Sequence, residues 1–296
     1  MNRELLLATL AKGKKMLERA RLSRPQQEAE TLLTRLTGYK RHELYLKDGL
    51  VLSQGLEEAF IDMINKRCEG MPIQYITGVE SFMGMDFKVN EHTLIPRADT
   101  EILVESVLMF AKSAQKSLNI LDLCTGSGNI AVSLAKLLSG AHIWAIDISS
   151  NALEVARENA RLNGVEHKIE FLAGDMFRPL ENNSVFDIIV SNPPYIKSAD
   201  ILKLEPQVRF YEPETALDGG LDGLCFYREI VVQAALFLRD GGFLAVEVGH
   251  DQADCVAEML KENGNYKDIE KVKDLAMIDR VVLARAKKER FLCGIN

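Results

Sequence analysis

Short apolar runs alternate with helical stretches through the last two thirds of the chain, and this order allows few folds. Strands that alternate with helices form a mostly parallel sheet covered on both faces, so the pattern predicts a doubly wound α/β domain with a seven-stranded sheet. The predicted strands are 120–123, 143–146, 169–172, 185–190, 243–248 and a terminal pair, 268–273 and 279–284, that a short turn can join if it is antiparallel. The predicted helices between them are 129–138, 151–162, 222–239 and 250–263.

The first 70 residues show apolar residues at helical spacing only. One stripe begins at Leu6, a second follows Pro25, and a third ends near Cys68. The run 78–89 alternates weakly and predicts a short hairpin. We therefore assign residues 1–75 to a small helical domain, 76–93 to a hairpin linker and 94–296 to the α/β domain.

Charge and cysteine content exclude several classes of protein. The net charge is -7, and it is uneven, with +5 on residues 1–50 and -8 on residues 101–296, which argues against nucleic-acid binding through a basic surface. The five cysteines include no CxxC pair and the five histidines lack metal spacing, so neither a disulfide framework nor a metal site is indicated. No apolar run reaches the roughly 20 residues of a membrane span and no signal peptide is evident. We expect a cytoplasmic protein without membrane contact.

A glycine loop follows the first predicted strand. Gly126 and Gly128 let the backbone approach a ligand closely, and with Ala131 they match the dinucleotide-binding spacing Gly-x-Gly-x-x-Ala. The second strand ends at Asp147, whose carboxylate can accept hydrogen bonds from both hydroxyls of a ribose. A tight turn without a ligand, and an Asp that only caps the next helix, are the alternatives. Together the two features favour a nucleoside site without choosing between NAD and S-adenosylmethionine.

The fourth predicted strand ends in Asn192-Pro193-Pro194-Tyr195. The two prolines fix φ near about -65° and lack N–H groups, so the turn is stiff and its carbonyl groups have no internal partners. This set suits a planar NH2 group, whose hydrogens would go to the Asn192 side-chain oxygen and the Pro193 backbone oxygen while Tyr195 packs nearby. A turn that provides rigidity alone is the alternative.

Two acceptors on an NH2 group would activate its nitrogen. The lone pair of an amide or aromatic amine is delocalised, and acceptors that pull on the hydrogens raise the electron density on nitrogen and orient it. Methyl transfer from a sulfonium disperses positive charge, which fixed acceptor dipoles stabilise without a metal or a strong base. The sequence therefore favours S-adenosylmethionine and no metal, because an NAD dehydrogenase or a non-catalytic nucleoside-binding adaptor leaves the NPPY tetrad unused.

Several segments together resemble the PrmC/HemK family, the glutamine-N5 methyltransferases of peptide chain release factors. They are the tetrad NPPY, LDLCTGSGNIAVSLA, LIPRADTE, RFYEPETALDGGLDGLCFYREI and GGFLAVEVG, and the resemblance covers nearly the whole chain. It implies a class I, Rossmann-like methyltransferase domain at 94–296 and a substrate-recognition domain at 1–75. The implied reaction methylates the side-chain amide of the glutamine in the Gly-Gly-Gln motif of class I release factors and yields S-adenosylhomocysteine, modulating translation termination. We expect a monomer.

The resemblance also implies roles for individual residues. Asn192, Pro193 and Tyr195 would be catalytic and would bind the glutamine together with Pro194. The implied cofactor-binding residues are Cys124, Thr125, Gly126, Ser127, Gly128, Asp147, Asp175, Met176 and Asn192. The departures from the family pattern are Cys124 in place of the usual glycine, Ala98-Asp99 in place of Pro-Glu, and Met176 where a larger apolar or aromatic residue is frequent. None removes a group that the chemistry needs.

An amino methyltransferase acting on adenine in DNA or RNA is the alternative enzyme, because the adenine NH2 presents the same two hydrogens. The acidic charge after residue 101 would repel a phosphate backbone, and no Lys/Arg cluster with aromatics occurs there, so direct nucleic-acid binding is not expected. Arg97 and Glu101 either line the substrate mouth or form an ion pair between domains. Trp144 is expected in the core, and 218–223 as a flexible loop before a helix.

Overall fold

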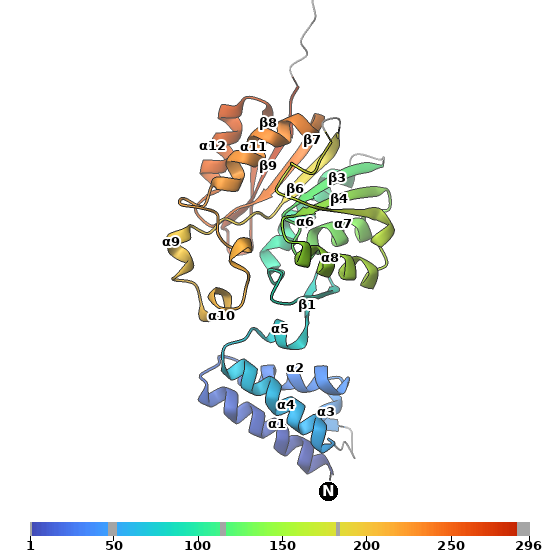
Figure 1. Cartoon of the computed structure of the whole chain (residues 1–296), viewed down its shortest axis with the longest axis vertical. Coiled ribbons are helices and arrows are strands. Elements are labelled where there is room, and N and C mark those ends of the chain that lie inside the picture. Colours follow the sequence, from blue (N-terminus) through green and yellow to red (C-terminus); the bar gives the residue numbers. More distant parts are fainter. Residues whose placement is uncertain (1, 47–51, 113–116, 182–183, 289–296) are drawn as a thin grey trace, which may run out of the picture. The chain divides into compact units, whose positions relative to one another are not determined.

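The computed structural model describes residues 2–46, 52–112, 117–181 and 184–288 of the 296. The chain divides into two compact units, one with Met1–Val79 and Glu205–Tyr211 and the other with Glu80–Leu204 and Glu212–Asn296 (Figure 1). The sequence did not indicate that Glu205–Tyr211 belongs to the first unit. The domain limits at 75 and 93 stay a prediction. No helix in the described part of the chain is long and apolar enough to cross a membrane.

The first unit is helical. Pro25 occupies the first turn of its second helix, where its missing N–H costs no hydrogen bond, and the Ser53 hydroxyl caps the fourth helix by accepting from the Leu56 N–H at 3.3 Å. Leu17, Leu33 and Phe60 are fully buried in its core. The three predicted helices are thus confirmed. The helices are α1 (Asn2–Arg19), α2 (Pro25–Thr37), α3 (Glu43–Leu46), α4 (Gln54–Cys68), α5 (Ile73–Thr77) and α10 (Pro206–Arg209).

The second unit is built on a seven-stranded sheet of order β5-β4-β3-β6-β7-β9-β8. The first five strands of this order run parallel, and β9 pairs antiparallel with both β7 and β8. The doubly wound prediction and the antiparallel ending are both confirmed. The strands are β3 (Leu118–Leu123), β4 (Ala141–Asp147), β5 (Ile169–Ala173), β6 (Phe186–Ser191), β7 (Leu238–Glu247), β8 (Tyr266–Lys273) and β9 (Asp279–Ala286). The predicted hairpin is a separate two-stranded sheet of β1 (Val79–Phe82) and β2 (Met85–Lys88).

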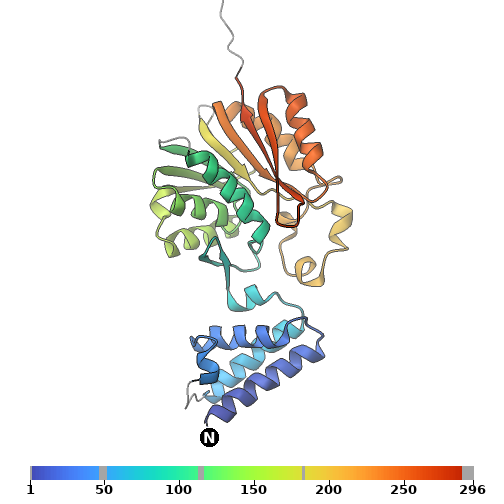
Figure 2. The same cartoon turned by 180° about the vertical axis from the view of Figure 1, so that it is seen from behind.

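Helices cover both faces of the large sheet. One face packs against α6, α7 and α8 and the other against α11 and α12, and the buried residues form one apolar cluster on each side (Figure 2). Trp144 is half-buried and packs edge-on against Phe186 on the α11 side, with ring centroids 5.3 Å apart, so it lies against the core without being enclosed by it. Helix α6 was not predicted from the sequence. The helices are α6 (Ala98–Lys112), α7 (Asn129–Leu137), α8 (Ser150–Leu162), α9 (Ser198–Ile201), α11 (Cys225–Phe237) and α12 (Ala253–Asn263).

The strand order reverses between β3 and β6, and this position determines where a ligand can bind. From β3 the sheet grows outward through β4 and β5, whereas from β6 it grows the other way through β7. Crevices outside the carboxyl ends of the strands at such a switch point are the usual ligand sites of doubly wound sheets. Leu123 pairs with Ser191 in the ladder between these strands, so the loops that begin at Cys124 and Asn192 start side by side.

Candidate active site

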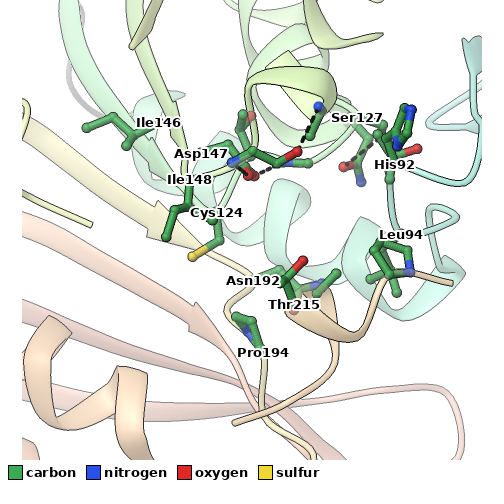
Figure 3. A pocket seen from close by; sticks show the side chains of 18 of the residues that line it. His92, Leu94, Cys124, Ser127, Ile146, Asp147, Ile148, Asn192, Pro194 and Thr215 are labelled. Carbon is green, nitrogen blue, oxygen red and sulfur yellow. Dashed lines mark hydrogen bonds between the residues drawn. The ribbon is translucent and has the colours of Figure 1, made fainter. Parts of the chain in front are cut away.

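A cavity of about 480 Å³ lies at this switch point, entirely within the second unit. Figure 3 shows Cys124 between Asp147 and Asn192, in agreement with the order of the strands that they follow. The predicted site residues that line the cavity are Cys124, Thr125, Gly126, Ser127, Asp147, Asp175, Met176, Asn192 and Pro194. Gly128, Pro193 and Tyr195 are not among its lining residues.

The glycine loop after β3 is folded around a buried acid, Asp122. The Thr125 hydroxyl and the Ala131 N–H both donate to Asp122 Oδ2, at 2.6 and 3.2 Å. Burial raises the pKa of the Asp122 carboxyl to about 7. Gly128 has φ +78°, and a Cβ there would lie 3.0 Å from that of Ala156, so a glycine is needed where the loop enters α7. Local contacts therefore hold the loop in its shape.

Asp147 lies at the end of β4 and faces this loop. Its Oδ2 accepts from the Gly126 N–H at 2.8 Å and its Oδ1 from the Ser149 N–H at 2.9 Å. Ser149 itself caps α8, because its hydroxyl accepts from the Ala152 N–H at 3.2 Å. The alternative reading of Asp147 as the helix cap is therefore wrong. Each carboxylate oxygen has more than one acceptor site, so Asp147 retains capacity for ligand hydroxyls.

The loop after β5 adds an apolar wall. Met176 is buried with φ +50°, and its sulfur lies 3.7 Å from the Cys124 sulfur. Burial raises the pKa of the Cys124 thiol, with Asp147 and Asp122 adding to the effect, so the thiol is neutral near pH 7. The Asp175 carboxylate pairs with Arg178 at 3.0 Å at the edge of the cavity. Two polarizable sulfur atoms thus form a wall that suits the face of an aromatic ring.

The NPPY turn follows β6, and α6 orients its first residue. The Asn192 Nδ2 donates to the Thr100 hydroxyl at 3.1 Å, and Thr100 is buried in the first turn of α6. Since Nδ2 and Oδ1 are opposite ends of one planar amide, this contact turns Oδ1 away from Thr100. Pro193 and Pro194 are buried. The structure thus presents an amide oxygen as the polar group at the β6 end of the cavity.

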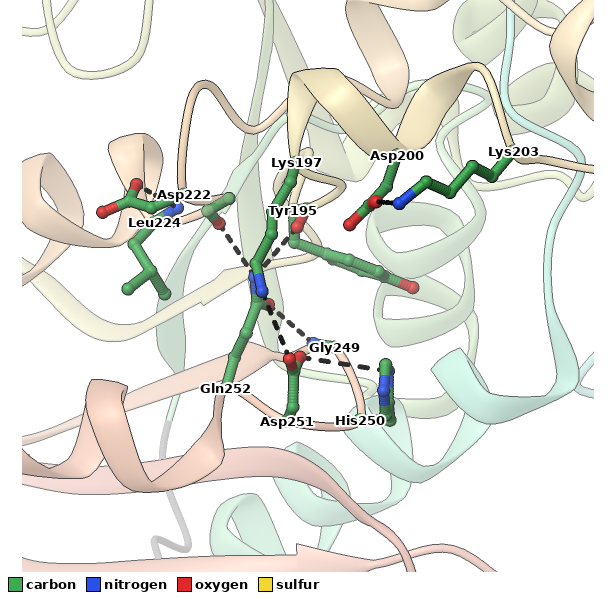
Figure 4. Close-up of polar contacts among 11 residues, drawn as sticks. Tyr195, Lys197, Asp200, Lys203, Asp222, Leu224, Gly249, His250, Asp251 and Gln252 are labelled. Carbon is green, nitrogen blue, oxygen red and sulfur yellow. Dashed lines mark hydrogen bonds and ion pairs between the residues drawn. The ribbon is translucent and has the colours of Figure 1, made fainter.

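Gln252 fixes the other end of the turn (Figure 4). Its Nε2 donates to the carbonyls of Tyr195 and Gly223, at 2.9 and 3.1 Å, and its Oε1 accepts from the Gly249 N–H at 2.9 Å. A Cβ at Gly223 would lie 2.4 Å from the Tyr195 oxygen, and one at Gly219 2.7 Å from its Cα, so these glycines allow the 218–223 loop to pack on Tyr195. This loop precedes α11 as predicted, and it also supports the turn.

Several residues that line or support the cavity were not among the predicted site residues. Arg97 lines the cavity and pairs with the buried Glu212, whose Oε2 also accepts from the Ile95 N–H at 3.3 Å. Glu101 is not a lining residue, and its carboxylate accepts from the Met83 N–H at 2.6 Å. Arg97 and Thr100 lie within the motif LIPRADTE, which could have identified them. His92, which also lines the cavity, and Gln252 belong to no motif or spacing pattern that would have identified them. Among the described residues no cluster of three or more potential metal ligands occurs.

Comparison of the sequence with protein families gives two matches. A methyltransferase domain matches residues 114–290, and a PrmC N-terminal domain matches residues 8–78. Relatives named release factor glutamine methyltransferase match along most of both chains. The protein of Moorella thermoacetica is 42% identical over 90% of this chain and 94% of its own, and that of Geobacter sulfurreducens is 42% identical over 92% of each. The Agrobacterium fabrum protein is 37% identical over 94% of this chain and 96% of its own.

Comparison with solved structures shows the same fold at low sequence identity. The hMettl16 catalytic domain, solved in complex with a 3'UTR hairpin, gives a TM-score of 0.52 at 16% identity and covers 82% of this chain and 85% of its own. A methyltransferase of Pyrococcus furiosus gives 0.50 at 17% identity over 70% of this chain and 92% of its own. At this identity the likeness concerns the fold alone, which is that of Rossmann-like methyltransferases.

Proposed function

Because the chain belongs to the release factor glutamine methyltransferase family, we propose that it methylates the side-chain amide nitrogen (N5) of the glutamine in the Gly-Gly-Gln motif of class I release factors. The methyl donor is S-adenosylmethionine, and S-adenosylhomocysteine is the product. The observation that carries the proposal is the meeting of the glycine loop and the NPPY turn at one cavity, with Asn192 oriented by Thr100.

The cavity fits S-adenosylmethionine by volume and by its polar groups. Its volume of about 480 Å³ lies within the usual range for small-molecule sites. Asp147 would hold the ribose hydroxyls, the loop 124–128 would lie against the methionine part, and the wall of Met176 and Cys124 would cover the adenine. When bound, this cofactor supplies a methyl carbon on a positively charged sulfur, which is the chemistry that an amide nitrogen needs.

The NPPY turn would hold the glutamine amide and stabilise the charge that develops on it. The Asn192 Oδ1 and the Pro193 carbonyl accept the two amide hydrogens, which directs the nitrogen lone pair toward the methyl carbon. As the carbon–nitrogen bond forms and the carbon–sulfur bond breaks, the positive charge passes from sulfur to the amide, where the two oxygens would stabilise it. The methylated nitrogen then loses one proton to solvent, so no strong base is required. Tyr195, although it does not line the cavity, would pack nearby as part of the turn.

The remaining expectations belong to the same proposal. The release factor is the protein partner, and the relatives' names support this choice over adenine in DNA or RNA. We assign substrate recognition to the helical domain, 1–75, and methyl transfer to 94–296. Monomeric state, cytoplasmic location, and the absence of a metal, of membrane contact and of direct nucleic-acid binding stay predictions.

A methylation assay with three acceptors tests the proposal. Radiolabelled S-adenosylmethionine is supplied with a purified class I release factor, with its Gly-Gly-Glu variant, or with duplex DNA. We expect label in the first acceptor only. Label in DNA, or equal label in the two release factors, would overturn the substrate assignment.

A further inference from the structure

A buried acid lies beneath the NPPY turn, and no step of the proposed reaction uses it. Glu247 is the last residue of β7 and is 2% exposed. Its Oε1 accepts from the Tyr195 hydroxyl at 3.4 Å, whereas its Oε2 makes no hydrogen bond within the usual limits of distance and angle in the described part of the chain. Burying a carboxyl with an unpartnered oxygen is costly. Its position beside the turn indicates what it contributes.

Thr100 lies between this acid and Asn192. Its hydroxyl oxygen accepts from the Asn192 Nδ2 at 3.1 Å, and its side chain is near enough to the Glu247 carboxyl to stabilise the charged form. A hydroxyl has one hydrogen and two lone pairs. Because the Thr100 oxygen accepts from Asn192, its own hydrogen is available to the Glu247 carboxylate. If Thr100 directs this hydrogen to Glu247, the contacts run in one direction, from Asn192 through Thr100 to Glu247.

The direction of these hydrogen bonds decides which end of the Asn192 amide faces the cavity. A charged Glu247 can only accept, so a Thr100 hydroxyl that donates to it must accept from Nδ2, and Oδ1 is left for the substrate. A protonated Glu247 can donate to Thr100, which can then donate to Oδ1. The amide would be turned over, and its NH2 would meet the NH2 of the substrate.

We propose that Thr100 and Glu247 are positioning residues, which hold the Asn192 amide with its oxygen toward the substrate, Thr100 through its hydroxyl and Glu247 by accepting the hydrogen of that hydroxyl. The inference rests on the proposed function, because it assigns these residues to the orientation of a group that receives the glutamine amide. It extends that function to two side chains that lie 92 residues before Asn192 and 52 residues after Tyr195.

The orientation of the Asn192 side-chain amide is expected to depend on pH. Burial raises the pKa of the Glu247 carboxyl to about 7. Above that pH the carboxylate maintains the productive orientation, and as the pH falls through about 7 protonation releases it, so turnover falls. Three other groups face the carboxyl. Asp99 of α6 raises its pKa, whereas Arg280 of β9 and the Tyr195 hydroxyl lower it. Tyr227 of α11 donates to the Glu247 backbone carbonyl at 2.8 Å.

A pair of substitutions at Thr100 separates its hydroxyl from its shape. Thr100→Val retains the shape and removes the hydroxyl, and Thr100→Ser retains the hydroxyl. At saturating cofactor and pH 8 we expect kcat to fall about 10-fold or more in Thr100→Val and to recover most of the wild-type value in Thr100→Ser, with cofactor affinity within about 2-fold in both. Ser106→Ala, which removes a buried hydroxyl of the same helix that does not line the cavity, is the control. Equal losses in the two Thr100 variants, or none in Thr100→Val, would overturn the role of the hydroxyl.

Glu247→Gln tests whether protonation of the Glu247 carboxyl changes the orientation. A neutral amide can present its oxygen to Thr100 at every pH, so we expect most of the activity at pH 8 and no fall of kcat below pH 7, where the wild type declines. An unchanged pH profile would contradict the proposal. Far-ultraviolet circular dichroism and cofactor titration on each variant show whether it is folded.

A spectroscopic readout needs no release factor. The side-chain NH2 signals of Asn192, identified by their loss in Asn192→Ala, are followed by ¹⁵N NMR from about pH 5 to about pH 9. We expect them to shift with a midpoint near pH 7 in the wild type and to stay fixed in Glu247→Gln. Fixed signals in the wild type, or the same shift in both proteins, would overturn the positioning role. A wild type that shows this shift but does not methylate release factors would instead overturn the proposed function alone.

Discussion

The two ends of the cavity are held together in different ways. At the end formed by the loops after β3 and β4, partners lie close in sequence: Asp122 accepts from groups three and nine residues further on, and Asp147 from one 21 residues before it. At the end formed by β6, Asn192 depends on Thr100, 92 residues away, and the Tyr195 carbonyl on Gln252, 57 residues away. The first end is thus specified by a short motif, whereas the second requires the completed sheet and its helices.

The largest effect is expected at the β6 end, from Asn192→Ala. Removing one of two acceptors of the developing charge should lower kcat by about 10²-fold or more while the dissociation constant of S-adenosylmethionine changes little. Single-turnover methylation and cofactor titration on the same preparation measure both quantities. Weaker cofactor binding with an unchanged rate per bound complex would place Asn192 at the wrong end of the cavity.

Asp147→Asn should do the reverse of Asn192→Ala: it should weaken cofactor binding and leave kcat nearly unchanged. The Asn side chain has no charge and only one oxygen, so it cannot accept from both the Gly126 and the Ser149 N–H as the two carboxylate oxygens do. It also has fewer acceptor sites for the ribose hydroxyls. Hydrogen bonds to charged groups contribute roughly 1.5–3 kcal/mol, so we expect cofactor affinity to fall about 10- to 100-fold and kcat at saturation to stay within a few-fold. Isothermal titration measures the affinity, and Asp86→Asn, at an exposed position of β2, is the control. A loss of kcat with unchanged cofactor affinity would contradict the assignment of Asp147 to cofactor binding.

Gln252→Leu tests whether a distant support of the turn affects the chemistry. It leaves two buried carbonyls and one N–H without their partner, so the free energy of unfolding should fall by about 2–4 kcal/mol. We expect kcat to fall about 10-fold through the shifted turn and cofactor affinity to stay near the wild-type value. Gln233→Leu, at a partly exposed position of α11 that does not line the cavity, controls for the change of side chain. Lower stability with an undiminished kcat would show that Gln252 is a structural residue only.

The smallest effect on catalysis is expected for Asp122→Asn, which acts on stability. The pKa of Asp122 is about 7 in the folded protein against an ordinary 3.8, so the folded form binds its proton more tightly and the free energy of unfolding falls as pH rises from about 4 to about 7. The substitution removes this dependence and should stabilise the protein by at most about 4 kcal/mol at pH 8 and hardly at all near pH 4.

Urea unfolding at several pH values measures this effect. A stabilisation that is equal at both ends of the pH range would show that the buried charge is not its cause. Glu247, whose pKa is also about 7, acts in the same direction and leaves a residual slope in the Asp122→Asn variant.

The sequence predicted the parts of the molecule that local patterns specify. Seven strands, the glycine loop and the NPPY turn each depend on residues near one another, so periodicity and turn chemistry identified them. Helix α6 was missed because its start at Ala98 follows a proline-containing segment that was noticed only as a motif. Thr100, Glu247 and Gln252 could not be assigned, since an isolated polar residue gives no sign that the fold will place it against a turn far along the chain.

The central claim is that the β6 end of the cavity presents a glutamine amide to the methyl donor. Tandem mass spectrometry of a class I release factor after reaction with the wild type and with Asn192→Ala tests it most directly. We predict one methyl group on the side-chain nitrogen of the Gly-Gly-Gln glutamine with the wild type, and about 10²-fold slower appearance with the variant although it binds cofactor normally. A methyl group at another residue, or equal rates for the two proteins, would contradict the account.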